Sequence, residues 1–150
     1  MERALQRDEH VIIATGTRHI VLRDPVHGLT ADPYGPGRFT IEMHGGAVRT
    51  EHRVFMFNNS WIPFHQFFAD LVLDADRSRA RRWVSPEHDL TIDAVGDPLG
   101  HYQLTFTIQD GATPTWTAML HRLTVEQREE MRALADRLKE WIYIYSRAAS

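Results

Sequence analysis

The sequence predicts an α+β fold: an antiparallel sheet of about seven strands, with two helices packed on one side of it. Two observations predict this class. Short segments with alternating apolar residues follow one another with turns between them, and two other segments have the apolar spacing of a helix. The expected order is four strands, a helix, a three-strand meander and a long C-terminal helix. We expect residues 1–150 to form a single domain, because this length suits one hydrophobic core.

The strands are predicted from alternation and from turn residues. Segment 38–44 alternates apolar and polar residues, and Gly45-Gly46 after it predicts a two-residue hairpin turn. That turn would place Glu42 opposite Arg49 on the return strand. The return strand ends in a run, 54–57, that is apolar on both faces and indicates burial or a bulge. The full set of predicted strands is 10–15, 19–23, 38–44, a return strand ending at 57, 90–94, 102–108 and 115–123.

Both helices have clear sequence signals. Pro63 suits a first helical turn, since its missing N–H has no partner there in any case. The apolar face of this helix consists of Phe64, Phe67, Phe68, Leu71, Val72 and Ala75. The second helix is predicted to start at a capping box, Thr124 to Gln127, and its apolar stripe includes Leu138.

The composition is that of a soluble globular domain, with 43% hydrophobic and 25% charged residues. The absence of cysteine excludes disulfides, thiol nucleophiles and cysteine-ligated metal sites. No apolar run is long enough to span a bilayer, and the N-terminus has no signal-peptide pattern, so we expect a cytoplasmic protein without a membrane partner. A net charge of −3 argues against nucleic acid as a partner.

No set of residues has the spacing of a catalytic or metal site. The nine histidines include no His-x-His and no His-Glu-x-x-His pattern. Ser85, His88 and Asp89 superficially match a hydrolase set, but neighbouring strand residues point to opposite faces, so Asp89 cannot orient His88. We therefore expect no catalytic residue, no metal and no cofactor, and favour a protein that is not an enzyme.

Two short segments are candidates for partner binding. Arg81 and Arg82 precede Trp83, and arginine and tryptophan are the residue types that dominate protein interfaces. The alternative is a solvated linker whose charge is balanced by nearby aspartates. His27 and Tyr34 lie in a loop rich in proline and glycine, where recognition residues tend to occur; plain disorder is the alternative there.

A third candidate lies near the end of the C-terminal helix. Tyr143, Ile144 and Tyr145 make the last turns apolar on all sides. A helix end of this kind is typical of docking, and these residues would be the contact in a homodimer.

Several short motifs occur in the order found in one bacterial family. They are Phe67–Leu71, the run from Trp83 to Ala94, Gly100 to Leu104, and Pro114 to Ala118. In these motifs the chain resembles an uncharacterised family of small actinobacterial proteins known only as a domain of unknown function. It is more loosely similar to WapI-type immunity proteins. The stretch from Asp74 to Arg81 departs from the family pattern. The resemblance implies a fold and a binding role, and it transfers no catalytic residue.

The function predicted from the sequence is a non-enzymatic protein-binding module of immunity type. Its partner would be a cognate toxin or another protein, and a mildly acidic surface would suit a basic target. One alternative is a small-ligand-binding protein or enzyme with a cavity between a curved sheet and the C-terminal helix. A second alternative is a homodimer without other activity.

Overall fold

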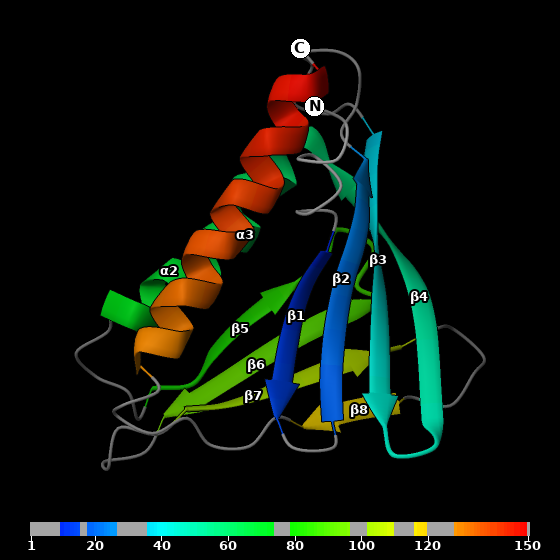
Figure 1. Cartoon of the computed structure of the whole chain (residues 1–150), viewed down its shortest axis with the longest axis vertical. Helices are drawn as coiled ribbons and strands as arrows, with labels where there is room; N and C mark the ends of the chain where they lie inside the picture. The colour runs from blue at the N-terminus through cyan, green and yellow to red at the C-terminus, as the bar shows by residue number, and fades with distance from the viewer. Residues whose placement is uncertain are drawn as a thin grey trace.

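The computed structural model describes residues 10–15, 18–26, 36–73, 79–96, 102–109, 116–119 and 128–149, and structural statements refer to these. They form eight strands, a short 3-10 helix and two α-helices (Figure 1). The elements in chain order are β1 (His10–Thr15), β2 (Arg18–Val26), β3 (Pro36–Gly45), β4 (Val48–Phe57), η1 (Asn58–Ser60), α2 (Trp61–Leu73), β5 (Arg81–Val84), β6 (Leu90–Gly96), β7 (Tyr102–Ile108), β8 (Trp116–Met119) and α3 (Arg128–Ala149).

The strands form two antiparallel sheets of four. The first sheet has the order β1-β2-β3-β4 and the second has the order β5-β6-β7-β8, so every pair of hydrogen-bonded strands is consecutive in the chain. Figure 1 shows the strands of the second sheet crossing those of the first at a steep angle, with α2 and α3 side by side over one face of the first sheet. Sequential hairpins produce this topology, because antiparallel neighbours need only short connections.

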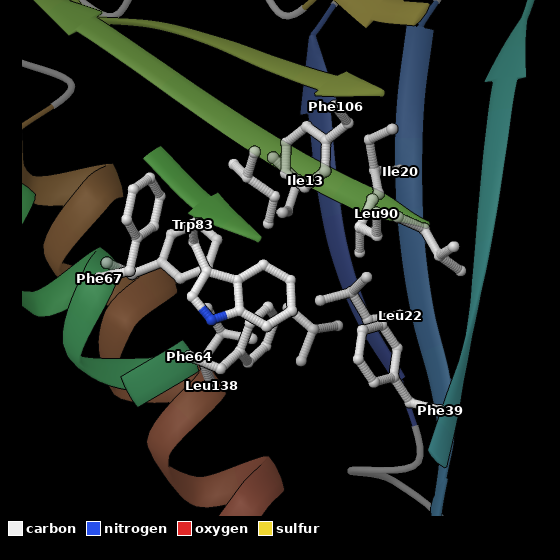
Figure 2. Close-up of a cluster of buried hydrophobic side chains, with 14 of the residues drawn as sticks. Ile13, Ile20, Leu22, Phe39, Phe64, Phe67, Trp83, Leu90, Phe106 and Leu138 are labelled. Atoms are coloured by element: carbon white, nitrogen blue, oxygen red, sulfur yellow. The ribbon is translucent and has the colours of Figure 1, made fainter. Parts of the chain in front are cut away.

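One apolar core joins the two sheets and the helices. Alternate residues of β2 and β3 point into it, among them Ile20, Leu22 and Phe39, which are fully buried. The second sheet contributes Leu90 and Phe106, and the helices contribute residues such as Phe64 and Leu138 (Figure 2). The space between the first sheet and α3 is thus filled by side chains; Phe39 lies edge-on to Trp141 of α3 at 5.8 Å between ring centroids.

The predicted α+β class is confirmed, together with its antiparallel pairing and the order of strands and helices. The structure adds one element, because segment 81–84 forms β5 where the sequence indicated no strand. It also divides the strands between two sheets. Alternation along a strand indicates which residues point inward, but alone it carries no information about which strands share a sheet.

The β3–β4 hairpin has a different register from the predicted one. Its turn residues are Gly46 and Ala47, so Gly45 pairs with Val48, and Glu42 lies opposite Glu51 rather than Arg49. Only Gly46 takes a positive φ, 62°, which a two-residue turn with glycine in its first position requires. The register moves by an even number of positions, and the faces of both strands therefore stay as predicted.

A close approach at Gly37 fixes the start of α2 against the first sheet. A Cβ atom at Gly37 would lie 2.8 Å from the carbonyl oxygen of Val26 and 3.2 Å from the indole nitrogen of Trp61. Trp61 is the first residue of α2 and is buried. Glycine at this position therefore lets the indole lie directly on the strand.

Candidate functional site

The first sheet has one face that neither helix covers. We call it the outer face; it consists of the strand residues that alternate with the buried ones. Two halves of this face differ in chemistry. The paired half lies toward the β3–β4 turn and contains Arg23, Glu42, His44, Arg49 and Glu51. The open half lies toward the start of β3 and the end of β4 and contains Arg38, Arg53, Phe55 and Phe57.

Glu42 is the centre of the paired half. Only 8% of the residue is exposed, although it lies on the outer face. Its carboxylate accepts a hydrogen bond from Nε of Arg23 and contacts Nε2 of His44 at 2.9 Å and Nη2 of Arg49 at 3.0 Å. Burial opposes ionisation, but the hydrogen bonds from Arg23 and His44 outweigh it and lower the pKa of Glu42. The carboxylate is therefore held ionised by two guanidinium groups and a hydrogen bond to an imidazole.

The other members of the paired half are linked in the same way. Arg23 forms ion pairs with Asp24 and Glu51 as well as with Glu42, and these contacts raise the pKa of its guanidinium above the usual range. The ring of His44 stacks on that of His19, with centroids 4.2 Å apart and an angle of 8° between the planes. These side chains satisfy one another, which makes the paired half a structural network.

The open half has the opposite character. Arg38 and Arg53 are exposed, and neither forms an ion pair with another residue that the structure describes. Arg38 lies directly opposite Phe55 in the β3–β4 ladder. Phe55 and Phe57 pack edge to face with centroids 5.0 Å apart, and Phe57 is 36% exposed. Two cationic and two aromatic side chains thus share a surface with no acidic residue among them.

A groove lies between α2 and β5, on a different part of the molecule. It has a volume of about 440 Å³ and brings together Arg81, Arg82 and Trp83, three of the residues predicted to bind a partner, with Arg79 beside them. Nε of Arg82 donates to Oδ1 of Asp93 at 2.7 Å. Trp83 is 8% exposed and packs on Phe64 at 4.7 Å between ring centroids, so it is mainly a core residue.

Five further residues are predicted to bind a partner or a second copy of the chain. His27 and Tyr34 lie outside the described residues. Tyr143, Ile144 and Tyr145 belong to α3, but their side chains are also outside what the structure describes. Their roles stay predictions.

The superficial hydrolase set is split up by the fold. His88 is exposed, with a φ of 62°, while Asp89 contacts Nε2 of His52 at 2.6 Å across the two sheets. Oγ of Ser85 donates to Asp89 at 2.6 Å, and the serine is 1% exposed. The carboxylate therefore lies between the hydroxyl and the imidazole, an order that does not activate a serine nucleophile. In the part of the chain that the structure describes, no three potential ligands cluster as a metal site would need.

The chain belongs to the family of unknown function DUF6228, whose model matches residues 13–144. This agrees with the predicted resemblance to a domain of unknown function. No curated protein matches the chain.

Two solved structures are similar in fold at very low sequence identity. The plant transcriptional regulator PBF-2 superposes with a TM-score of 0.52 and 8% identity, over 93% of this chain and 84% of that one. WHY1 from Arabidopsis thaliana has a TM-score of 0.51 and 10% identity, over 91% of this chain and 90% of that one. At such identity the likeness concerns the fold.

The predicted partners need correction. We expected a protein partner, a toxin or a second copy, and excluded nucleic acid because the net charge is −3. That prediction is wrong, since a plant transcriptional regulator has the same fold. The physical reason is the location of the charge. A net charge summed over the chain does not describe a local surface, and on the outer face Arg38 and Arg53 are exposed without an ion pair to another described residue.

None of the described helices is long and apolar enough to cross a membrane.

Proposed function

We propose that this member of the DUF6228 family binds single-stranded nucleic acid on the outer face of its first sheet. The open half carries the proposal, because exposed Arg38 and Arg53 lie beside the rings of Phe55 and Phe57. Arginine neutralises backbone phosphates, and an aromatic ring offers a surface on which a base can stack. Exposed aromatic residues on an open antiparallel sheet are a common platform for unpaired bases.

The geometry of the two rings favours a single strand over a duplex. The planes of Phe55 and Phe57 are nearly perpendicular, at 86°. Bases in a duplex are parallel and about 3.4 Å apart along each strand, so two neighbouring bases could not both lie flat on these rings. Unpaired bases can turn independently and meet each ring in its own orientation.

The fold offers independent support of a weaker kind. A plant transcriptional regulator is built on the same arrangement of sheets and helices, at 8% identity. The shared fold raises the expectation of a nucleic-acid role without assigning a residue.

The test is a titration of a fluorescently labelled oligothymidylate of about 12 nucleotides with purified protein, followed by anisotropy. The variant is the double substitution Arg38→Ala and Arg53→Ala. We expect its affinity to fall at least about tenfold and the slope of log K against log salt to decrease by about 1.4, for two lost phosphate contacts on a single strand.

The matched control removes two arginines elsewhere. Arg132 and Arg137 are exposed on α3, away from the outer face, so Arg132→Ala with Arg137→Ala should keep the affinity and the slope. Absence of binding at micromolar protein would overturn the proposal. Equal losses in both double variants, or equal affinity for a duplex of the same length, would also contradict it.

The family resemblance predicts a different function, an immunity-type protein-binding role, and this role remains a prediction. It does not depend on Arg38, Arg53 or the two phenylalanines. A protein that fails the oligothymidylate titration would leave this role, and the small-ligand alternative, as the functions to test next.

A further inference from the structure

The two arginines of the open half lie close together on the outer face rather than along its length. Arg53 is directly opposite Thr40 in the β3–β4 ladder, and Arg38 is the neighbouring outward residue of β3. Arg38 and Arg53 are therefore diagonal neighbours across the two strands, a separation that long side chains span. Thr40 is only 7% exposed and forms the floor below these longer side chains. Two guanidinium groups can thus reach a single phosphate from two sides.

The paired half bounds this pair of arginines on the side of the β3–β4 turn. The next outward residues in that direction are Glu42 and Glu51, which lie opposite each other in the ladder. They engage both guanidinium groups of the paired half. The side chains of Glu51 and Asp24 are 49% and 57% exposed. A nucleic-acid backbone that continued past Arg53 in this direction would meet exposed carboxylates and guanidinium groups that already have partners.

The aromatic rings lie on the other side of the two arginines. The outward residues of β4, which is the edge strand of the first sheet (Figure 1), follow one another as Arg53, Phe55 and Phe57, about 7 Å apart. Phe55 is directly opposite Arg38. On the described part of the outer face, no arginine or lysine lies beyond the two rings. The order is therefore one cationic position followed by two stacking surfaces, which suits the end of a strand better than its middle.

We propose that the open half binds the phosphorylated end of a single strand, with the terminal phosphate between Arg38 and Arg53. This inference rests on the proposed function and adds which part of the strand is recognised. A terminal phosphate monoester has three free oxygens and a charge of about −1.5 to −2 at neutral pH, whereas an internal phosphodiester has a single charge. Two guanidinium groups at one phosphate therefore gain more from the terminal group. A 5′-phosphate and a 3′-phosphate share this chemistry, and the experiment distinguishes them.

Competition against a fluorescently labelled oligothymidylate, followed by anisotropy at about 0.15 M salt, tests the inference. The unlabelled competitors are oligothymidylates of about 12 nucleotides with a 5′-phosphate, a 3′-phosphate or hydroxyl groups at both ends. We expect at least one of the two phosphates to lower the dissociation constant about tenfold or more relative to the hydroxyl-ended strand. If only one of them does so, it gives the direction of the strand on the sheet.

Variants separate recognition of the end from a general loss of binding. Arg38→Ala with Arg53→Ala should bring the affinities for phosphorylated and hydroxyl-ended strands to within about twofold of each other. Phe57→Ala should weaken both strands by a similar factor and leave their ratio unchanged, because this ring contacts a base in either case. Arg132→Ala with Arg137→Ala on α3 is the control for surface charge and should keep the wild-type ratio.

The possible failures of the inference and of the proposed function are distinguishable. If the hydroxyl-ended strand binds and neither phosphate lowers the dissociation constant, recognition of the end is wrong and the site on the outer face stands. An equal advantage of the phosphorylated strand in the wild type and in the Arg38→Ala, Arg53→Ala variant would also overturn the inference, because the phosphate would then bind elsewhere. If no oligothymidylate binds, the proposed function fails and the inference fails with it.

Discussion

The two halves of the outer face are made from the same strands, yet their arginines have different environments. In the paired half, Arg23 and Arg49 reach a carboxylate, Glu42, that is almost completely covered. In the open half, Arg38 and Arg53 are exposed beside two phenylalanines and form no ion pair with the rest of the described chain. The difference teaches that a count of charges does not identify a binding surface. What matters is which charges already have a partner within the fold.

The largest expected effect is a loss of folding stability when the central carboxylate of the paired half is removed. Glu42→Ala removes the shared partner of Arg23, His44 and Arg49 and leaves them facing one another, so we expect the free energy of unfolding to fall by about 2–3 kcal/mol. Urea denaturation measures it. Glu51→Ala is the control, because that carboxylate is about half exposed and should cost under about 1 kcal/mol. Equal costs for the two would show that burial does not set the strength of the network.

The second-largest expected effect is a loss of affinity for oligothymidylate when an aromatic ring of the open half is removed. Phe57→Ala should weaken oligothymidylate binding by roughly tenfold, the loss of one stacked base, while Phe57→Tyr should keep the affinity. Anisotropy titration measures both. Ile62→Ala provides a control, since Ile62 is a more exposed apolar residue, at 59%, on α2 outside the outer face. If Ile62→Ala weakened oligothymidylate binding as much as Phe57→Ala, non-specific hydrophobic contact would explain the effect of Phe57.

The third effect is a pH dependence confined to the paired half. The pKa of Glu42 is lower in the folded protein than in the unfolded chain, so the unfolded state binds the proton more tightly. The stabilisation is therefore complete above the ordinary range of a glutamate pKa and is lost as the pH falls through the lowered value. Thermal unfolding between about pH 3 and 7 should show a smaller acid loss in Glu42→Gln than in the wild type. If the melting temperatures of Glu42→Gln and the wild type fell equally with decreasing pH, Glu42 would not be the source of the acid loss.

The smallest expected effect is the change in folding stability when the two arginines of the open half are removed. Arg38→Ala with Arg53→Ala should change the free energy of unfolding by no more than about 0.5 kcal/mol, because neither side chain has a partner to lose among the described residues. The same urea denaturation measures it. A loss comparable to that of Glu42→Ala would mean that the open half also supports the fold, and it would remove the contrast between the halves.

The faces of the first sheet could be predicted from the sequence, but its cross-strand pairs could not. Alternation in β3 correctly placed Glu42 outward and Phe39 inward. The turn was predicted one residue early, since Gly45 and Gly46 both permit a positive φ and only Gly46 uses it. Arg49 still reaches Glu42 from a diagonal position, because its side chain is long enough to span the offset.

The candidate site was largely missed for a related reason. The run Val54-Phe55-Met56-Phe57 indicated burial or a bulge, because apolar residues occupy both faces. In the structure, Val54 and Met56 fill the core while Phe57 remains exposed on the outer face. The sequence signal that could have indicated an exposed aromatic surface was a strand with apolar residues on both faces and an arginine nearby. The contact between His52 and Asp89 joins residues 37 positions apart, and local pattern carries no information at that range.

Both sheets have their strands in chain order, and this has a consequence for how the protein acquires its structure. Each hairpin can close a short loop before any distant segment is in place, which lowers the entropy cost of the early steps. Because strands that pair are neighbours in the chain, we expect each four-stranded meander to form faster than sheets built with long crossovers. The slow step would then be the docking of two preformed meanders, and residues that join them, such as His52 and Asp89, would influence its rate.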